Sequence, residues 1–321
     1  GFKEISQEVP EAQWILKRLS PVPEQVEFVA EMTQRWVHLR QLQNAEKRVA
    51  IILANYPNKD SRLGNGVGLD TPESVALFLK KLVQQGYSLG NEIPVDGEAL
   101  ITRLQQGITN DPEGNYGKEC EHWLTAEQFG KCLGGLPVSL RQQLQSQWSI
   151  EQEFYPIAGF TLGKVFIGLQ PPRGFGEQTQ AIYHSPDLPP PPNYLAFYWW
   201  LRTEFQADAI IHFGKHGNLE WLPGRSVGLG AEDFPWQVLG PIPHLYPFIV
   251  NNPGEGTQAK RRSSAVIVDH LTPPLARAGL YDELQQVERL LEEHSHCETM
   301  FPERAHELEH QIEHLLEQAS W

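Results

Sequence analysis

The segment IIHFGKHGNLEWLPG, residues 210–224, places three side chains that can bind a metal at intervals of four. They are His212, His216 and Glu220. Imidazole binds divalent transition metals, and a carboxylate can complete such a site or accept a proton. The spacing also fits a strand end with a hydrogen-bonded histidine and a surface glutamate. Glycines within the segment allow the main chain to approach a ligand closely, and they favour the functional interpretation.

A second candidate site is NNPGEGTQAKRR, residues 251–262. Its glycines precede an expected helix N-terminus, where free N–H groups favour an anion. Lys260, Arg261 and Arg262 follow within two turns. These cations could form a solvated helix face with ordinary ion pairs. The functional interpretation is a clamp for a ligand that carries carboxylates.

Two further motifs suggest chemistry that the surrounding sequence does not favour. HELEH, residues 306–310, matches the H-E-x-x-H signature of zinc peptidases. Its neighbours are mostly Glu and Gln, so a solvated helix face is favoured over a peptidase. GFTLGKV, residues 159–165, has the wrong spacing for a Walker A loop and lacks its Ser or Thr. The sequence therefore gives no sign that this chain hydrolyses ATP.

Composition narrows the class of protein. The 321 residues carry a net charge of −14, which disfavours a general binder of nucleic acid or anionic membranes. No apolar run is long enough to predict a membrane span. The three cysteines are far apart and form no CxxC pair, which indicates a reducing compartment, and we predict a cytoplasmic location. The first residue is Gly1 rather than Met, which suggests an internal piece of a longer protein.

The elements that must position these residues alternate between strands and helices. Apolar, β-branched runs predict strands at 47–57, 164–172, 207–213 and 245–250. Residues 10–46 and 281–320 have helical patterns, and a further helix is expected to begin at Thr71 and Pro72. The pattern predicts an α/β fold with one or more mostly parallel sheets flanked by helices, with helical N- and C-terminal extensions.

Four segments are expected along the chain. They are an N-terminal helical segment at 1–45, an α/β domain with a glycine-rich loop at 46–160, a second α/β domain that carries both candidate sites at 161–275, and a C-terminal helical extension at 276–321. The polar loops that follow the strands are expected to converge, because ligands bind at the C-terminal ends of parallel strands.

Four long motifs in order carry a family resemblance. KRVAIILANYPNKDSRLGNGVGLDTPESV, ADAIIHFGKHGNLEWLPG, GPIPHLYPFIVNNPGEGTQAKRRSSAVIVDHLTPPL and AGLY together resemble the large subunit of aerobic cobaltochelatase. That subunit is similar to the large, porphyrin-binding subunit of magnesium chelatase. The resemblance covers roughly residues 46–281 and implies that this chain is an internal fragment, because family members are several times longer.

The resemblance implies a function and a set of roles. The function is ATP-dependent insertion of Co²⁺, the substrate metal, into the corrin precursor hydrogenobyrinic acid a,c-diamide during cobalamin biosynthesis. ATP and Mg²⁺ would bind only to separate partners, an AAA+ ATPase subunit and its integrin-like companion. Glu220 would be the catalytic carboxylate, and His216 would be a second catalytic residue. Glu255 and His244 are secondary candidates for contacts with the substrate, beside the basic cluster.

Two alternatives remain open from the sequence. One is insertion of magnesium into a porphyrin, as in the related branch. The other is a non-catalytic tetrapyrrole-binding or scaffold fragment that docks the motor subunits.

Overall fold

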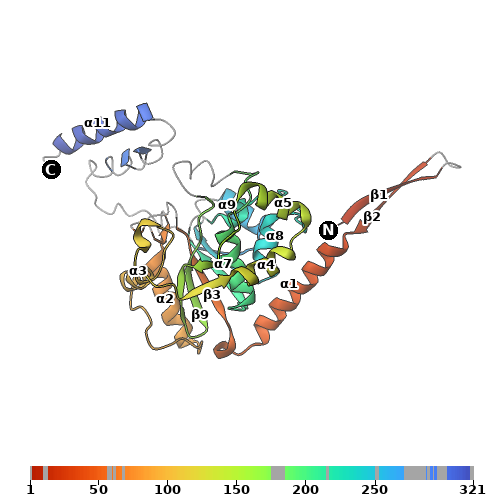
Figure 1. Ribbon diagram of the computed structural model, residues 1–321, viewed down its shortest axis with the longest axis horizontal. Helices are drawn as coiled ribbons and strands as arrows, with labels where there is room; N and C mark the ends of the chain where they lie inside the picture. The colour runs from red at the N-terminus through yellow and green to blue at the C-terminus, as the bar shows by residue number, and fades with distance from the viewer. Residues whose placement is uncertain are drawn as a thin grey trace. The chain divides into compact units, whose positions relative to one another are not determined.

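The computed structural model describes residues 2–9, 14–55, 60, 63–66, 69–174, 185–214, 217–249, 253–270, 287, 290–291, 293–294 and 302–318. The chain forms two compact units (Figure 1). The first comprises residues 1–174 and 180–271, and the second comprises residues 175–179 and 272–321.

A six-stranded sheet organises the first unit. Its strand order is β12-β11-β10-β3-β9-β8, and every neighbouring pair is parallel except β8 and β9. The strands are β3 (Val49–Leu53), β8 (Gly159–Leu162), β9 (Val165–Leu169), β10 (Ala209–Phe213), β11 (His244–Ile249) and β12 (Val266–His270). The predicted α/β fold with a mostly parallel sheet is confirmed.

The three central strands are buried on both faces. Every residue of β3 (VAIIL), β9 (VFIGL) and β10 (AIIHF) is buried. Nearly continuous apolar runs are typical of parallel strands that helices cover on both sides. His212 is the one polar side chain among these fifteen residues, so its burial requires hydrogen-bond partners.

Helices pack on both faces of the sheet, as Figure 1 shows for α2 and α7. On one face, α2 (Thr71–Gln84) and α3 (Gly97–Gln106) cover Val49, Ile51 and Leu53. On the other face lie α4 (Ala126–Gly134), α5 (Val138–Gln147), α7 (Pro192–Thr203) and α8 (Phe234–Leu239). The aromatic side chains of α7 are buried there.

The connections reverse direction at β3. From β3 the chain adds β9 and β8 on one side, and it then crosses back to add β10, β11 and β12 on the other. The predicted segments 46–160 and 161–275 therefore contribute strands to one sheet, and no boundary separates them near residue 160, because β3 pairs with both β9 and β10. Ligands bind at such a switch point, outside the carboxyl ends of the strands.

The N-terminal segment differs in part from its predicted helix. α1 (Pro23–Gln41) is helical, but β1 (Phe2–Val9) and β2 (Trp14–Pro21) form an antiparallel hairpin before it. Prolines at 21 and 23 restrict the chain there, since the residue before a proline is pushed out of the helical region. The helix accordingly begins at Pro23, and residues 14–21 form β2 by pairing with β1, which corrects the helix predicted from residue 10.

Several short elements complete the first unit: η2 (Asn44–Glu46), β4 (Asn65–Gly66), β5 (Leu69–Asp70), η4 (Glu113–Asn115), β6 (His122–Thr125), β7 (Phe154–Ile157), η5 (Leu219–Trp221) and α9 (Pro253–Arg262). In the second unit, α11 (Pro302–Gln318) buries Ala305, Leu308 and Ile312 along one stripe. None of the described helices combines the length and apolar character needed to cross a membrane.

Candidate functional site

The loop that follows β10 carries the predicted catalytic carboxylate into the interior. β10 ends at Phe213, and the 3-10 helix η5 places Glu220 with only 2% of its surface exposed. Asn218, two residues earlier, is fully buried. Lys215 and His216 lie outside the described residues. The structure therefore places Glu220 near the carboxyl edge of the sheet, and the predicted role of His216 stays a prediction.

The Glu220 carboxylate, the Tyr246 hydroxyl and Gly217 lie together. A methyl group added at Gly217 would lie 3.0 Å from Glu220 Oε2 and 3.0 Å from the Tyr246 hydroxyl oxygen. Burial raises the pKa of Tyr246 well above its usual value, and the negative charges of Glu220 and Glu255 raise it further. Tyr246 therefore remains a neutral hydroxyl beside the carboxylate. The absence of a side chain at Gly217 leaves room for that carboxylate.

Arg262 holds the main chain of this loop. Its guanidinium donates hydrogen bonds to the carbonyl oxygens of Glu220 at 2.6 Å, Leu222 at 2.7 Å and Arg225 at 3.1 Å. Burial lowers the pKa of Arg262, and the negative charges of Asp233 and Glu220 oppose that shift. Arg262 thus joins the end of α9 to the Glu220 loop. Its neighbours Lys260 and Arg261 are exposed.

A buried chain of polar side chains runs from β9 to the end of α9. Gln170 Nε2 donates to the Tyr198 hydroxyl at 2.7 Å, and that hydroxyl lies 2.9 Å from His212 Nε2. His212 Nδ1 lies 2.6 Å from His244 Nε2, and His244 Nδ1 lies 3.2 Å from the carbonyl oxygen of Ser263. Both imidazoles therefore have partners at both ring nitrogens.

The partners assign a proton to each nitrogen of the two histidines. The Ser263 carbonyl can only accept, so His244 carries its proton on Nδ1 and accepts at Nε2. His212 must then donate from Nδ1 and accept the Tyr198 proton at Nε2. Burial lowers the pKa of His244 to about 4 and, with His244 beside it, lowers the pKa of His212 well below its usual value. Both rings are neutral.

This arrangement bears on the predicted metal ligands. A metal would have to displace either Tyr198 or His244 from His212, because both ring nitrogens are already hydrogen-bonded. In the described part of the chain, no three His, Cys, Asp or Glu side chains are grouped so that they could hold a metal ion. The metal roles of His212 and Glu220 stay predictions.

The same chain of side chains fixes the loop that leads to Glu220. The Asn218 amide N–H donates to Gln170 Oε1 at 3.2 Å, and the Tyr194 hydroxyl donates to Asn218 Oδ1 at 2.5 Å. Burial raises the pKa of Tyr194 well above its usual value, so the hydroxyl keeps its proton. The positioning residues for this loop are therefore Gln170, Asn218, Tyr194 and Tyr198.

Comparison with known proteins shows the family of this chain. A family model described as CobN/Magnesium Chelatase matches residues 2–321. The chain is 48% identical over 296 residues to the aerobic cobaltochelatase subunit CobN of Pseudomonas aeruginosa, an alignment that covers 90% of this chain and 24% of that protein. The chain belongs to the CobN/magnesium chelatase family. The resemblance predicted from the sequence is confirmed.

The relatives of this chain also include magnesium-chelatase subunits. A magnesium-chelatase subunit of Chlorobaculum parvum is 33% identical over 288 residues, covering 85% of this chain and 22% of that protein. Among solved structures, the catalytic subunit of cobaltochelatase from Mycobacterium tuberculosis matches with a TM-score of 0.74 and 38% identity, covering 99% of this chain and 27% of that one. The chain spans about a quarter of the length of the curated relatives it matches.

Sequence reasoning missed a buried cation in this family member. Arg173 follows β9 and is fully buried. Its guanidinium donates to the carbonyl oxygens of Trp221 at 3.0 Å and Leu188 at 2.7 Å. Arg173 and Arg262 thus hold η5 and the residue after it from two directions. The signal in the sequence is an arginine within the loop that leaves a buried strand, QPPRG, where an unpaired charge would be costly.

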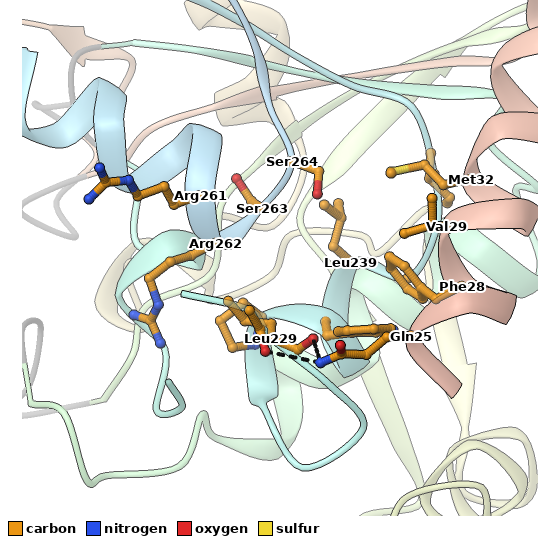
Figure 2. Close-up of a pocket in the computed structure, with 15 residues that line it drawn as sticks. Gln25, Phe28, Val29, Met32, Leu229, Leu239, Arg261, Arg262, Ser263 and Ser264 are labelled. Atoms are coloured by element: carbon orange, nitrogen blue, oxygen red, sulfur yellow. Dashed lines mark hydrogen bonds between the residues drawn. The ribbon is translucent and has the colours of Figure 1, made fainter. Parts of the chain in front are cut away.

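A cavity of about 220 Å³ lies behind the end of α9. Figure 2 shows it between α1 side chains, including Phe28 and Met32, and the segment around Ser263. Gln25 closes one wall by donating to the carbonyl oxygens of Gly228 and Leu229 at 3.0 and 2.8 Å. The guanidinium groups of Arg261 and Arg262 point away from the α1 side chains (Figure 2).

The HELEH motif lies on α11 in the second unit. His306 and His310 are exposed there. His306 Nδ1 lies 3.2 Å from Glu309, and His310 Nδ1 lies 3.6 Å from Glu313. These are exposed pairs within one helix, as expected for the solvated helix face that the sequence favours.

Proposed function

We propose that this chain is part of a longer catalytic subunit that inserts Co²⁺ into a corrin precursor, hydrogenobyrinic acid a,c-diamide. ATP would be hydrolysed by a separate AAA+ subunit that acts with an integrin-like companion. The observation that carries the proposal is the buried Glu220 carboxylate at the carboxyl edge of the sheet. It occurs in a chain 48% identical to an aerobic cobaltochelatase subunit.

Insertion requires that protons leave the ring nitrogens as the metal enters. Glu220 is the base that accepts a ring proton, since its neighbours Tyr246 and Tyr194 keep their own protons. The incoming cobalt must also lose water, and His216 and His212 are the ligands that replace it. For His212 this requires release of one of its two hydrogen bonds.

The ring must be held by its edge. Lys260 and Arg261 are exposed on α9 and would pair with ring carboxylates, whereas Arg262 acts by holding the Glu220 loop. Charge-assisted hydrogen bonds to carboxylates each contribute roughly 1.5–3 kcal/mol when they are desolvated. Glu255 and His244 are neighbours of Tyr246 in the same region and remain secondary candidates for contacts with the ring.

The second candidate function is insertion of magnesium into a porphyrin, which the 33% identity to a magnesium-chelatase subunit favours. The test supplies the full-length subunit, its partners and ATP with either Co²⁺ and the metal-free diamide or Mg²⁺ and a metal-free porphyrin. Cobalt insertion alone is expected. Magnesium insertion alone would support the second candidate. A subunit that binds its partners but neither ring nor Co²⁺ would be a scaffold.

Gly217→Ala tests the placement of the carboxylate. The added methyl group would lie 3.0 Å from Glu220 Oε2 and must displace it or the Tyr246 hydroxyl. We expect the insertion rate to fall roughly 10–100-fold, because small misplacements of a catalytic group have effects of this size. Ring affinity, measured by fluorescence titration, should change little.

The matched control is Gly130→Ala on α4, where an added methyl group meets nothing within 4 Å. It should insert cobalt at the unmutated rate. An unmutated rate for Gly217→Ala as well would show that the carboxylate does not act from this position.

A further inference from the structure

Asn55 is a buried amide for which the described residues supply no hydrogen-bond partner. Its side chain is only 2% exposed. Neither Nδ2 nor Oδ1 has a partner in the part of the chain that the structure describes. The side-chain amides of Gln170, directly after β9, and of Asn218, in the loop after β10, are both hydrogen-bonded. Leaving a buried donor and acceptor unpaired is unfavourable, and most native proteins avoid it.

Asn55 lies at the switch point of the sheet. Leu53, the last residue of β3, pairs with Phe213 on one side and with Leu169 on the other. The Ala54 amide still donates to the Phe213 carbonyl at 3.3 Å, so Asn55 is the first residue beyond the ladder. Neighbouring strands lie about 5 Å apart, which places Asn55 between the chain after β9 and the chain that leads to Glu220.

A second feature of the switch point is the close approach of the segment that follows β10. Gly214 has φ +139°, and a methyl group added there would lie 3.1 Å from Ala54 Cβ. A side chain at position 214 would crowd the end of β3. The end of β3 is therefore narrow, and the Asn55 side chain there is unpaired among the described residues, which is the arrangement expected where a ligand supplies the missing partners.

A primary amide selects among ligands by its two atoms. Nδ2 donates, and either a carboxylate or a carboxamide can accept. Oδ1 accepts, and of these two groups only a carboxamide can donate. A site that offers both therefore prefers a carboxamide, because an ionised carboxylate leaves Oδ1 unpaired.

We infer that Asn55 is a specificity-determining residue that binds a carboxamide side chain of the macrocycle. The inference rests on the proposed function, in which the ring carries two such amides. Asn55 then distinguishes the amidated ring from the same ring with free carboxylates. Its unpaired state without ligand makes β3 less stable than an apolar residue would, and ligand binding supplies the hydrogen bonds.

The first test measures ring binding by the full-length subunit. Metal-free a,c-diamide and the corresponding diacid are titrated by fluorescence against the unmutated protein and Asn55→Leu. The unmutated protein should prefer the diamide by about tenfold, the equivalent of one net hydrogen bond near 1.4 kcal/mol. Asn55→Leu should lose that preference by weakening the diamide. Asn55→Ala, which creates no steric crowding, should lose it as well.

The second test measures stability and does not depend on the ring. Hydrogen exchange of the β3 amides should slow in Asn55→Leu without ligand, because an unpaired buried amide is removed. The matched control is Asn110→Leu, whose amide donates to the Gln170 carbonyl at 2.7 Å. In Asn110→Leu, hydrogen exchange should become faster, because a hydrogen-bonded amide is removed.

The results of these tests distinguish the inference about Asn55 from the proposed function. Faster β3 exchange in Asn55→Leu would show that the amide is already paired and would overturn the inference. Equal binding of diamide and diacid by the unmutated protein, or a preference kept by both variants, would overturn it while leaving the proposed function intact. Failure of the unmutated subunit to bind either ring would overturn the proposed function, and the role of Asn55 in selecting the ring with it.

Discussion

Glu220→Gln is expected to lower the rate of cobalt insertion by about 10²–10⁴-fold, the usual effect of losing a general base. Glutamine keeps the shape of the side chain in its buried position beside Tyr246, but it cannot take up a ring proton at neutral pH. Affinity for the metal-free ring should change little, since binding rests on other groups. Steady-state insertion with saturating partners and ATP gives the rate, and fluorescence titration gives the affinity.

Glu255→Gln is the informative companion variant. Glu255 lies in the first turn of α9, and its charge acts on the same tyrosine, so it is the alternative candidate for the base. Glu255→Gln should retain most of the insertion rate if Glu220 is the base. The opposite pattern, a fast Glu220→Gln and a slow Glu255→Gln, would transfer the role to Glu255.

Protonation of His244 is expected to destabilise the fold between about pH 6.5 and pH 4. Burial lowers the pKa of His244 from 6.5 to about 4 in the folded chain. Between these values the unfolded chain binds a proton that the folded chain excludes, so stability is complete above about pH 6.5 and falls as the pH is lowered through this window. The loss should amount to about 3 kcal/mol for this group.

Urea unfolding followed by tryptophan fluorescence, in buffer with a metal chelator, measures this dependence. His244→Gln should be less stable near neutral pH, because the bond to Ser263 is lost, but it should show a flatter dependence below pH 6.5. His38→Gln is the matched control, because His38 is a solvent-exposed histidine on α1. An unchanged slope in His244→Gln would show that His244 is not held neutral.

The parts of the fold that follow local rules could be predicted from the sequence. Strands β3, β9 and β10 were recognisable because parallel strands buried on both faces need continuous apolar runs. The start of α2 at Thr71 was recognisable because Pro72 suits the first turn of a helix, and the structure adds that Asp70 caps the helix by accepting from the Glu73 amide. Glu220 was singled out by its place in a glycine-rich loop after a strand.

The parts of the fold and of the site that depend on contacts between distant residues could not be predicted from the sequence. His212 and His244 are 32 residues apart, and nothing in either local sequence shows that one ring donates to the other. Arg262 looked like a surface cation in a basic run, yet it bonds carbonyl oxygens about 40 residues away. The hairpin β1–β2 was hidden because its residues also suit a helix, and only the cross-strand register distinguishes the two.

The position of the ring relative to Glu220 is the most direct test of the proposed mechanism. A structure of the full-length subunit with the metal-free diamide bound would measure the distance from the Glu220 carboxylate to the nearest ring nitrogen. A distance of about 2.6–3.2 Å, or a link through one water, is predicted for a base that takes the ring proton. A ring bound elsewhere on the subunit, with Glu220 still buried against Tyr246 and out of its reach, would contradict the role of this carboxylate.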